Sequence, residues 1–278
     1  MRCLGGIMLA ACCMALTGCV DLTAVADFAK ESSVITANEA QLNDSAALAL
    51  LYANGNKSAL DPNSQQYKDE VTLTQKALTA LNSYMGVLAQ LSASDLPSVS
   101  SETKAIGTDL ANLKVSGPEA TAALNATTSL TNLLLSALQQ RDIKTLVVKA
   151  KDPVDTILTY LIAKATLANV NYNGAITLSN EYWSSMVNPT DSDKVFCPKS
   201  GLCQPVYVLA TRARNADASD LDAKAKAAKN AAAAFTKIKA DNDALAQSAD
   251  HLNAQALIDA LKMDEPDLLT VIHSLSGK

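Results

Sequence analysis

The chain has 278 residues, a formal net charge of −5 at pH 7 and a pI near 5.1. This acidic balance disfavours nucleic acid, or an anionic lipid surface, as a partner recognised through bulk charge. Apolar residues make up 49% of the sequence and aromatic residues only 4%. The apolar content is therefore mostly alanine and leucine, which favour helices, so the composition predicts an all-α protein.

The first segment, residues 1–18, has the pattern of an export signal. Arg2 gives it a positive start. Residues 4–16 form an apolar run whose length is typical of signal peptides and too short to span a bilayer. The run ends in a leucine, two small residues and a cysteine, which are Leu16, Thr17, Gly18 and Cys19.

These four residues resemble the lipobox of bacterial lipoproteins, and the resemblance covers residues 1–19 only. It implies cleavage before Cys19, transfer of a diacylglyceryl group to its sulfur and acylation, commonly with palmitate, of the new amino group. Since each buried methylene contributes about 0.8 kcal/mol, one chain holds a protein weakly and two or more hold it stably. The alternative is an ordinary cleaved signal peptide that happens to end in Gly-Cys.

The residue after the cysteine bears on location. In enterobacterial lipoproteins an aspartate there favours retention in the inner membrane, and this chain has Val20 instead. The resemblance therefore implies a lipid anchor in the outer membrane, with the mature protein facing the periplasm; exposure on the cell surface is the alternative. Residues 19–278 are long enough for one large helical domain or two small ones, and a single helical-bundle domain is expected.

Two cysteines of the mature chain are expected to form a disulfide. Once Cys19 carries lipid, Cys197 and Cys203 are left in an oxidising compartment, where they should pair. Pro198 and Gly201 lie between them and can turn the chain, so a small structural disulfide loop is predicted. A redox-active cysteine pair more often has two intervening residues. A metal site would need further soft ligands, and the sequence near these two cysteines has none.

Hydrophobic periodicity predicts helices throughout the first half of the mature chain. Residues 22–54 contain no Gly or Pro and predict one helix that ends at Gly55. Residues 64–91 have apolar residues at alternating steps of three and four, which is typical of an antiparallel bundle helix. Two further helices are predicted over residues 102–114 and, starting with a first-turn proline, over residues 118–141.

In the second half, residues 142–151 predict a short helix. Asp152 and Pro153 then predict the cap and first position of a new helix, which contains the most apolar mature segment, residues 157–170. Pro205 is expected to begin a long final helical arm. No strand is predicted. The fold expected is an elongated, antiparallel, Ala/Leu-rich helical bundle with coiled-coil-like packing and one small disulfide loop.

No catalytic constellation is found in the sequence. His251 and His273 have no cysteine or second histidine at ligand spacing, and the carboxylates are scattered. A glycine-rich phosphate loop and a nucleophile elbow are also missing from the sequence. We therefore expect no enzyme activity, no catalytic residue, no cofactor and no metal site.

Aromatic side chains are concentrated in residues 160–207, which hold six of the eleven. Tyrosine and tryptophan combine an apolar ring with a polar group and are common at interfaces. Tyr182, Trp183 and Phe196, beside the predicted disulfide loop, are therefore a candidate recognition surface. The alternative is that these rings only fill the end of the bundle.

The sequence thus predicts a membrane-anchored, non-catalytic envelope protein that acts as a structural, adaptor or binding protein, with another envelope protein as its partner. The alternative is a periplasmic lipoprotein that binds a ligand or neutralises a toxin. A deep apolar pocket beside residues 157–170 would favour a small ligand, whereas an exposed acidic face would favour a cationic protein. The predicted disulfide loop is expected at the end of the bundle remote from Cys19.

Overall fold

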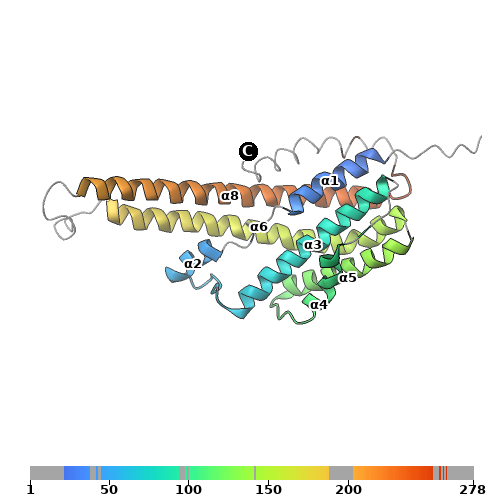
Figure 1. Cartoon of the computed structure of the whole chain (residues 1–278), viewed down its shortest axis with the longest axis horizontal. Coiled ribbons are helices and arrows are strands. Elements are labelled where there is room, and N and C mark those ends of the chain that lie inside the picture. The colour runs from blue at the N-terminus through green and yellow to red at the C-terminus, as the bar shows by residue number, and fades with distance from the viewer. Residues whose placement is uncertain are drawn as a thin grey trace, which may run out of the picture.

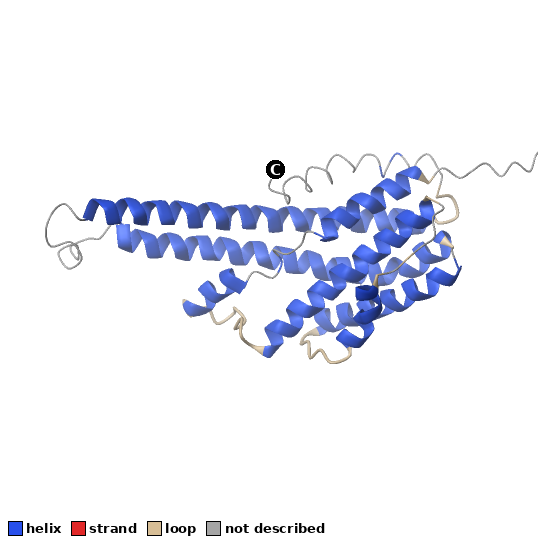
Figure 2. Ribbon diagram, viewed as in Figure 1, coloured by secondary structure: helices blue, strands red, loops and turns tan. Residues whose placement is uncertain are grey.

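The computed structural model describes residues 22–37, 42, 45–93, 98, 100–140, 142–187, 203–252, 257, 259 and 261. All the regular secondary structure in this part of the chain is helical (Figure 2), which confirms the all-α class. The helices are α1 (Thr23–Ala37), α2 (Ser45–Ala53), α3 (Gln65–Ser92), α4 (Ser101–Leu110), α5 (Pro118–Gln140), α6 (Ile143–Val187) and α8 (Cys203–Gln247).

Several helix ends lie where local sequence signals predict them. Ser64 caps α3, since its side chain accepts a hydrogen bond from the backbone N–H of Tyr67 at 3.1 Å. Gly117 adopts a φ of +90°, a left-handed conformation that suits glycine, directly before α5 begins at Pro118. The predicted starts of these two helices are therefore confirmed.

The prediction of one helix over residues 22–54 is wrong, because the chain forms α1 and α2 instead. α1 packs mainly on α3, whereas α2 packs mainly on α6, so one straight helix could not bury both apolar faces. The predicted end at Gly55 is confirmed. Gly55 donates to the carbonyl of Tyr52 and Asn56 donates to that of Leu51, which is the Schellman pattern of hydrogen bonds.

The prediction of a new helix at Asp152 and Pro153 is also wrong, since α6 runs without a break through Pro153. Val147 and Val154 are fully buried on either side of the proline, so one apolar face continues across it. A proline inside a helix costs about 3 kcal/mol, and core packing offsets that cost here. The carbonyl that loses its donor belongs to Lys149, an exposed residue, where water can reach it.

α6 and α8 run antiparallel to each other. Lys151 contacts Asp243 at 2.9 Å, and one turn further along α6 Asp155 contacts Lys239 at 3.0 Å, one turn earlier on α8. The pairing continues to Asn169, whose Nδ2 donates to the carbonyl of Ala225 at 2.7 Å. Beyond this point the two helices extend side by side past α1, α3, α4 and α5 (Figure 1). We call residues 168–187 and 203–228 the arm.

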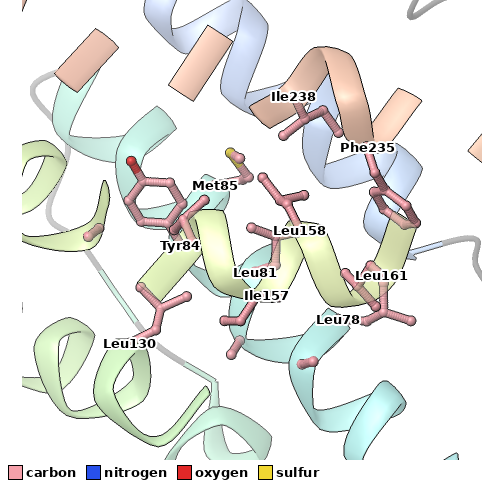
Figure 3. Packing of buried hydrophobic residues seen from close by; sticks show 14 of the residues in the cluster. Leu78, Leu81, Tyr84, Met85, Leu130, Ile157, Leu158, Leu161, Phe235 and Ile238 are labelled. Atoms are coloured by element: carbon pink, nitrogen blue, oxygen red, sulfur yellow. The ribbon is translucent and has the colours of Figure 1, made fainter. Parts of the chain in front are cut away.

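The main core lies where α3, α5, α6 and α8 meet, with α1 over α3. Figure 3 shows Met85 of α3, Leu130 of α5, Leu158 of α6 and Phe235 of α8 converging there. A second, smaller cluster lies at the base of the arm and contains Ala47, Ala168, Tyr172, Ala175, Ala225 and Ala228. Its many alanines allow the two backbones of the arm to approach closely.

Candidate functional site

A cavity of about 310 Å³ lies between α2, the loop that follows it, the start of α3 and the middle of α6. Apolar side chains form much of its lining, among them Leu48, Leu51, Leu60, Val71, Leu167 and Val170. The cavity borders residues 157–170, as expected for the small-ligand alternative. A concave, mainly apolar site with a few polar groups is typical of small-molecule binding.

The position of α2 creates this cavity. α2 has nine residues, and of these only Ala47 and Leu51 are buried. A Cβ atom at Gly174 of α6 would lie 3.1 Å from Cδ2 of Leu51. Because glycine has no side chain, α2 can pack closely on α6 at Gly174 and cover one side of the cavity.

One ion pair lies in the wall of the cavity. Nζ of Lys164 on α6 is 2.5 Å from Oε2 of Glu70 on α3, and the two side chains are only 19% and 13% exposed. The same Nζ lies 5.4 Å from the centre of the Tyr160 ring, an arrangement that favours a cation–π contact. Glu70 and Lys164 are the charged residues of the cavity lining, and they neutralise each other.

A second cavity of about 280 Å³ lies on the other side of this ion pair, next to Pro118 at the start of α5. Tyr160 also lines it, and its hydroxyl is 3.0 Å from Oγ1 of Thr74, within hydrogen-bonding distance. Burial raises the pKa of Tyr160 above its ordinary value, so this phenol stays protonated. Because Glu70 and Lys164 line both cavities, this ion pair can be approached from two sides.

The residues of the predicted recognition surface are not brought together in the described part of the chain. Tyr182 lies near the end of α6 and is 55% exposed. Trp183 follows it on α6, but its side chain lies outside the described residues, as does the whole of Phe196. The recognition surface therefore stays a prediction.

The predicted lipid site and disulfide also lie outside the described residues. Cys19 and Cys197 are not among them, and Cys203 is described only as the first residue of α8. Both features stay predictions. In the sequence, residues 188–202 separate the end of α6 at Val187 from the start of α8 at Cys203, and they lie outside the described ranges.

Four charges join α6 to α8. Lys239 of α8 lies 3.0 Å from Asp155 and 3.6 Å from Asp243, and Lys151 of α6 contacts the same two carboxylates. Lys151 donates a hydrogen bond to Asp243, and this bond holds the pKa of Asp243 below its ordinary value and raises the pKa of Lys151. Each carboxylate is thus paired with lysines, an arrangement suited to joining helices rather than to acid–base chemistry.

Within the described ranges, no group of three or more His, Cys, Asp or Glu side chains is placed to hold a metal ion. His251 is exposed, whereas His273 lies outside those ranges. None of the described helices is both long enough and apolar enough to cross a membrane. Comparison of the chain with known families, with curated proteins and with solved structures gives no match.

Sequence reasoning did not assemble the cavity, because its walls come from segments that lie far apart in the chain. One signal was present in Lys164, a cation inside the strongly apolar segment of residues 157–170. A lysine in such a segment needs a partner or access to solvent. The structure supplies the partner, Glu70, from a helix that the sequence pattern did not link to it.

Proposed function

We propose that this protein is a lipid-anchored, non-catalytic protein of the bacterial outer membrane, which faces the periplasm and binds another envelope protein. The anchor is the lipid on Cys19, in the lipobox sequence that ends the export signal. The binding region is the end of the arm, with Tyr182, Trp183 and Phe196 beside a loop closed by a disulfide between Cys197 and Cys203. The whole is an elongated bundle whose long helices pack in the manner of an antiparallel coiled coil.

The arm is the observation that carries this proposal. Its two helices extend together past the rest of the bundle, and α1, the helix that follows the lipobox, lies over the other part of the molecule (Figure 1). An anchor before α1 would therefore leave the arm pointing away from the membrane. The exposed side chain of Tyr182 near the end of α6 is a suitable contact for a partner.

The lipid anchor is tested by substitution of Cys19. Cells that express the wild-type chain, or Cys19→Ala, are labelled with an alkyne analogue of palmitate, and the envelope is fractionated. We expect label and outer-membrane fractionation for the wild type and neither for Cys19→Ala. Label that persists in Cys19→Ala would contradict the assignment of the anchor.

The partner surface is tested by crosslinking in cells. A photoreactive amino acid is placed at Tyr182 or, as a matched control, at Val148, an exposed apolar residue on the same helix but away from the arm. We expect a discrete crosslinked species from position 182 that is missing for position 148. Crosslinks of equal yield at both positions, or none from position 182, would argue against the arm as the binding region.

The second candidate function is the binding of a small ligand, and the cavity between α2, α3 and α6 favours it. Its apolar lining and its single ion pair fit a small molecule better than a cationic protein toxin. The test is native mass spectrometry of the protein released from outer membranes. A bound small molecule in the wild type that is missing when the cavity is filled by Val71→Trp would support this function, and its presence in both would contradict it.

A further inference from the structure

We propose that the cavity between α2, α3 and α6 binds a small uncharged amphiphile, whose apolar body lies among the leucines of α2 and whose polar head meets the Glu70–Lys164 pair. This inference rests on the second candidate function and adds the chemical class of the ligand. An alcohol, amide or ester with a short hydrocarbon chain has this chemistry.

The lining and the exposed rim of the cavity favour a ligand with an apolar body. Leu48 and Leu51 of α2 and Val71 of α3 line the cavity, whose volume of about 310 Å³ admits a small molecule. Leu167 and Val170 form part of the rim and are 52% and 59% exposed, which is unusual for side chains of this size. A bound hydrocarbon chain would remove apolar surface of both residues from water.

The electrostatics of the cavity wall favour a ligand with an uncharged head. Lys164 and Glu70 are 2.5 Å apart and mostly buried, so an added anion would be attracted by one and repelled by the other. An added cation meets the same balance. A charged head would thus lose its hydration without a net gain in attraction, whereas a hydroxyl or amide loses less.

Neutral hydrogen-bonding groups complete the polar side of the cavity. Asn171 of α6 and Asn56 of the loop after α2 both belong to its lining. Oδ1 of Asn56 accepts hydrogen bonds from the N–H and the hydroxyl of Ser58, which fixes its amide and leaves the NH₂ group as a donor. Amide groups of this kind suit the oxygen of an alcohol, amide or ester.

α2 forms the most weakly held wall of the cavity. This helix is short, packs mainly on α6 and buries only Ala47 and Leu51. A contact of so few buried residues separates more easily than the long contact of α6 with α8. α2 is therefore the side of the cavity that opens to admit the ligand.

The inference is tested by photolabelling of the full lipidated chain in vesicles of neutral lipid. Three probes share one medium-length alkyl diazirine chain and end in a hydroxyl, a carboxylate or an ammonium group. We expect the alcohol to label cavity residues saturably, with labelling by the charged probes about tenfold weaker. Val71→Trp should abolish labelling, and the matched control Val148→Trp, on the exposed face of α6, should not.

Charge variants provide a readout that does not depend on filling the cavity. Lys164→Met leaves Glu70 unbalanced, so labelling by the ammonium probe should rise, and Glu70→Gln should raise labelling by the carboxylate probe. The control Lys149→Met removes an exposed cation of α6 and should change neither. If Val71→Trp fails to fold, as judged by circular dichroism, these variants still decide the question.

The outcomes separate the two levels of the proposal. If a charged probe labels the wild-type cavity as strongly as the alcohol, or the charge variants shift nothing, the ligand class is wrong although the cavity still binds. If none of the three probes labels the cavity saturably, or a folded Val71→Trp labels like the wild type, both the ligand class and the second candidate function are wrong.

Discussion

The hydroxyl of Tyr84 on α3 donates a hydrogen bond to Oδ1 of Asn242 on α8, at 2.8 Å, and both side chains are fully buried. This bond links two helices that are far apart in the sequence, and Tyr84 belongs to the main hydrophobic core (Figure 3). Burial raises the pKa of Tyr84 well above its ordinary range, so the phenol remains a donor at any physiological pH.

Loss of this bond should destabilise the fold. Tyr84→Phe leaves the carbonyl oxygen of Asn242 buried without its donor, which costs about 1–3 kcal/mol in the free energy of unfolding. Urea denaturation measures this cost. The matched control is Tyr52→Phe, at a tyrosine that is 51% exposed, and we expect it to change stability by less than about 0.5 kcal/mol. Equal effects of the two substitutions would contradict the assigned role of Tyr84.

A double-mutant cycle isolates the bond itself. Asn242→Leu replaces the acceptor with an apolar side chain of similar size, and it also removes the partner of Tyr84. If the two residues act as a pair, the loss in Tyr84→Phe/Asn242→Leu should be smaller than the sum of the two single losses. Strict additivity would mean that the hydrogen bond contributes nothing beyond the packing of each side chain.

The four charges between α6 and α8 predict a pH dependence of stability. Because the pKa of Asp243 is lower in the folded chain than its ordinary value, its contribution is present above that value, about pH 4, and is lost as the pH falls through the folded-state pKa. The free energy of unfolding should therefore drop on acidification. Asp243→Asn should flatten this drop.

Asp222→Asn is the matched control for this loss of stability at low pH, since Asp222 is also on α8 and pairs with Lys226 on the exposed face. With Asp222→Asn, the free energy of unfolding should fall on acidification nearly as steeply as in the wild type.

The pKa of Lys151 predicts a loss of stability at alkaline pH. Its raised pKa means a contribution that is present below the ordinary lysine value and is lost as the pH rises through the folded-state pKa. Urea denaturation at a series of pH values measures the free energy of unfolding on both the acid and the alkaline side.

The part of the fold that could be predicted from the sequence is the part decided locally. Ser64, Pro118 and Gly55 act through hydrogen bonds or backbone angles within a few residues, so their signals are visible in the sequence. The division between α1 and α2 depends on which neighbour each helix meets, α3 or α6, and no local signal carries that information.

The candidate site depends even more on contacts between residues that are far apart in the sequence. Glu70 and Lys164 are ordinary charged residues on separate helices until the fold brings them together. Gly174 resembles any other helical glycine in the sequence, and its purpose is clear only when Leu51 lies against it. The proposed lipobox is the reverse case, since the resemblance rests on four adjacent residues, Leu16 to Cys19, and they lie outside the described structure.

Two helical glycines provide a matched test of how closely α2 packs on α6. A Cβ atom at Gly86 of α3 would meet nothing within 4 Å, whereas one at Gly174 would press on Leu51. Gly86→Ala should thus gain about 0.5–1 kcal/mol from helix propensity, and Gly174→Ala should gain less because Leu51 must shift. Thermal and urea denaturation compare the two. Equal gains would show that α2 does not depend on the close approach at Gly174.

A larger side chain at the same site should detach α2 without unfolding the bundle. Gly174→Phe cannot be accommodated beneath Leu51, so we expect faster hydrogen exchange over residues 45–53. Exchange in α3 should be unchanged, because α2 packs mainly on α6. Unchanged protection over residues 45–53 would contradict the placement of α2.

Pro153 tests the continuity of α6. In a continuous helix this proline lacks the N–H that would bond to the carbonyl of Lys149, so Pro153→Ala restores a hydrogen bond and relieves a steric clash. The gain of up to about 3 kcal/mol is reduced by about 1 kcal/mol, since alanine leaves the unfolded chain more freedom. We therefore expect a net stabilisation of about 2 kcal/mol in urea denaturation.

Pro118→Ala is the control for this prediction, because Pro118 occupies the first position of α5, where a proline loses no hydrogen bond. It should give no stabilisation. If α6 instead began at Pro153, with Asp152 as its cap, the two substitutions would behave alike and neither would stabilise the protein. A clear gain for Pro153→Ala alone thus distinguishes one long helix, held across its proline by buried Val147 and Val154, from two helices that meet there.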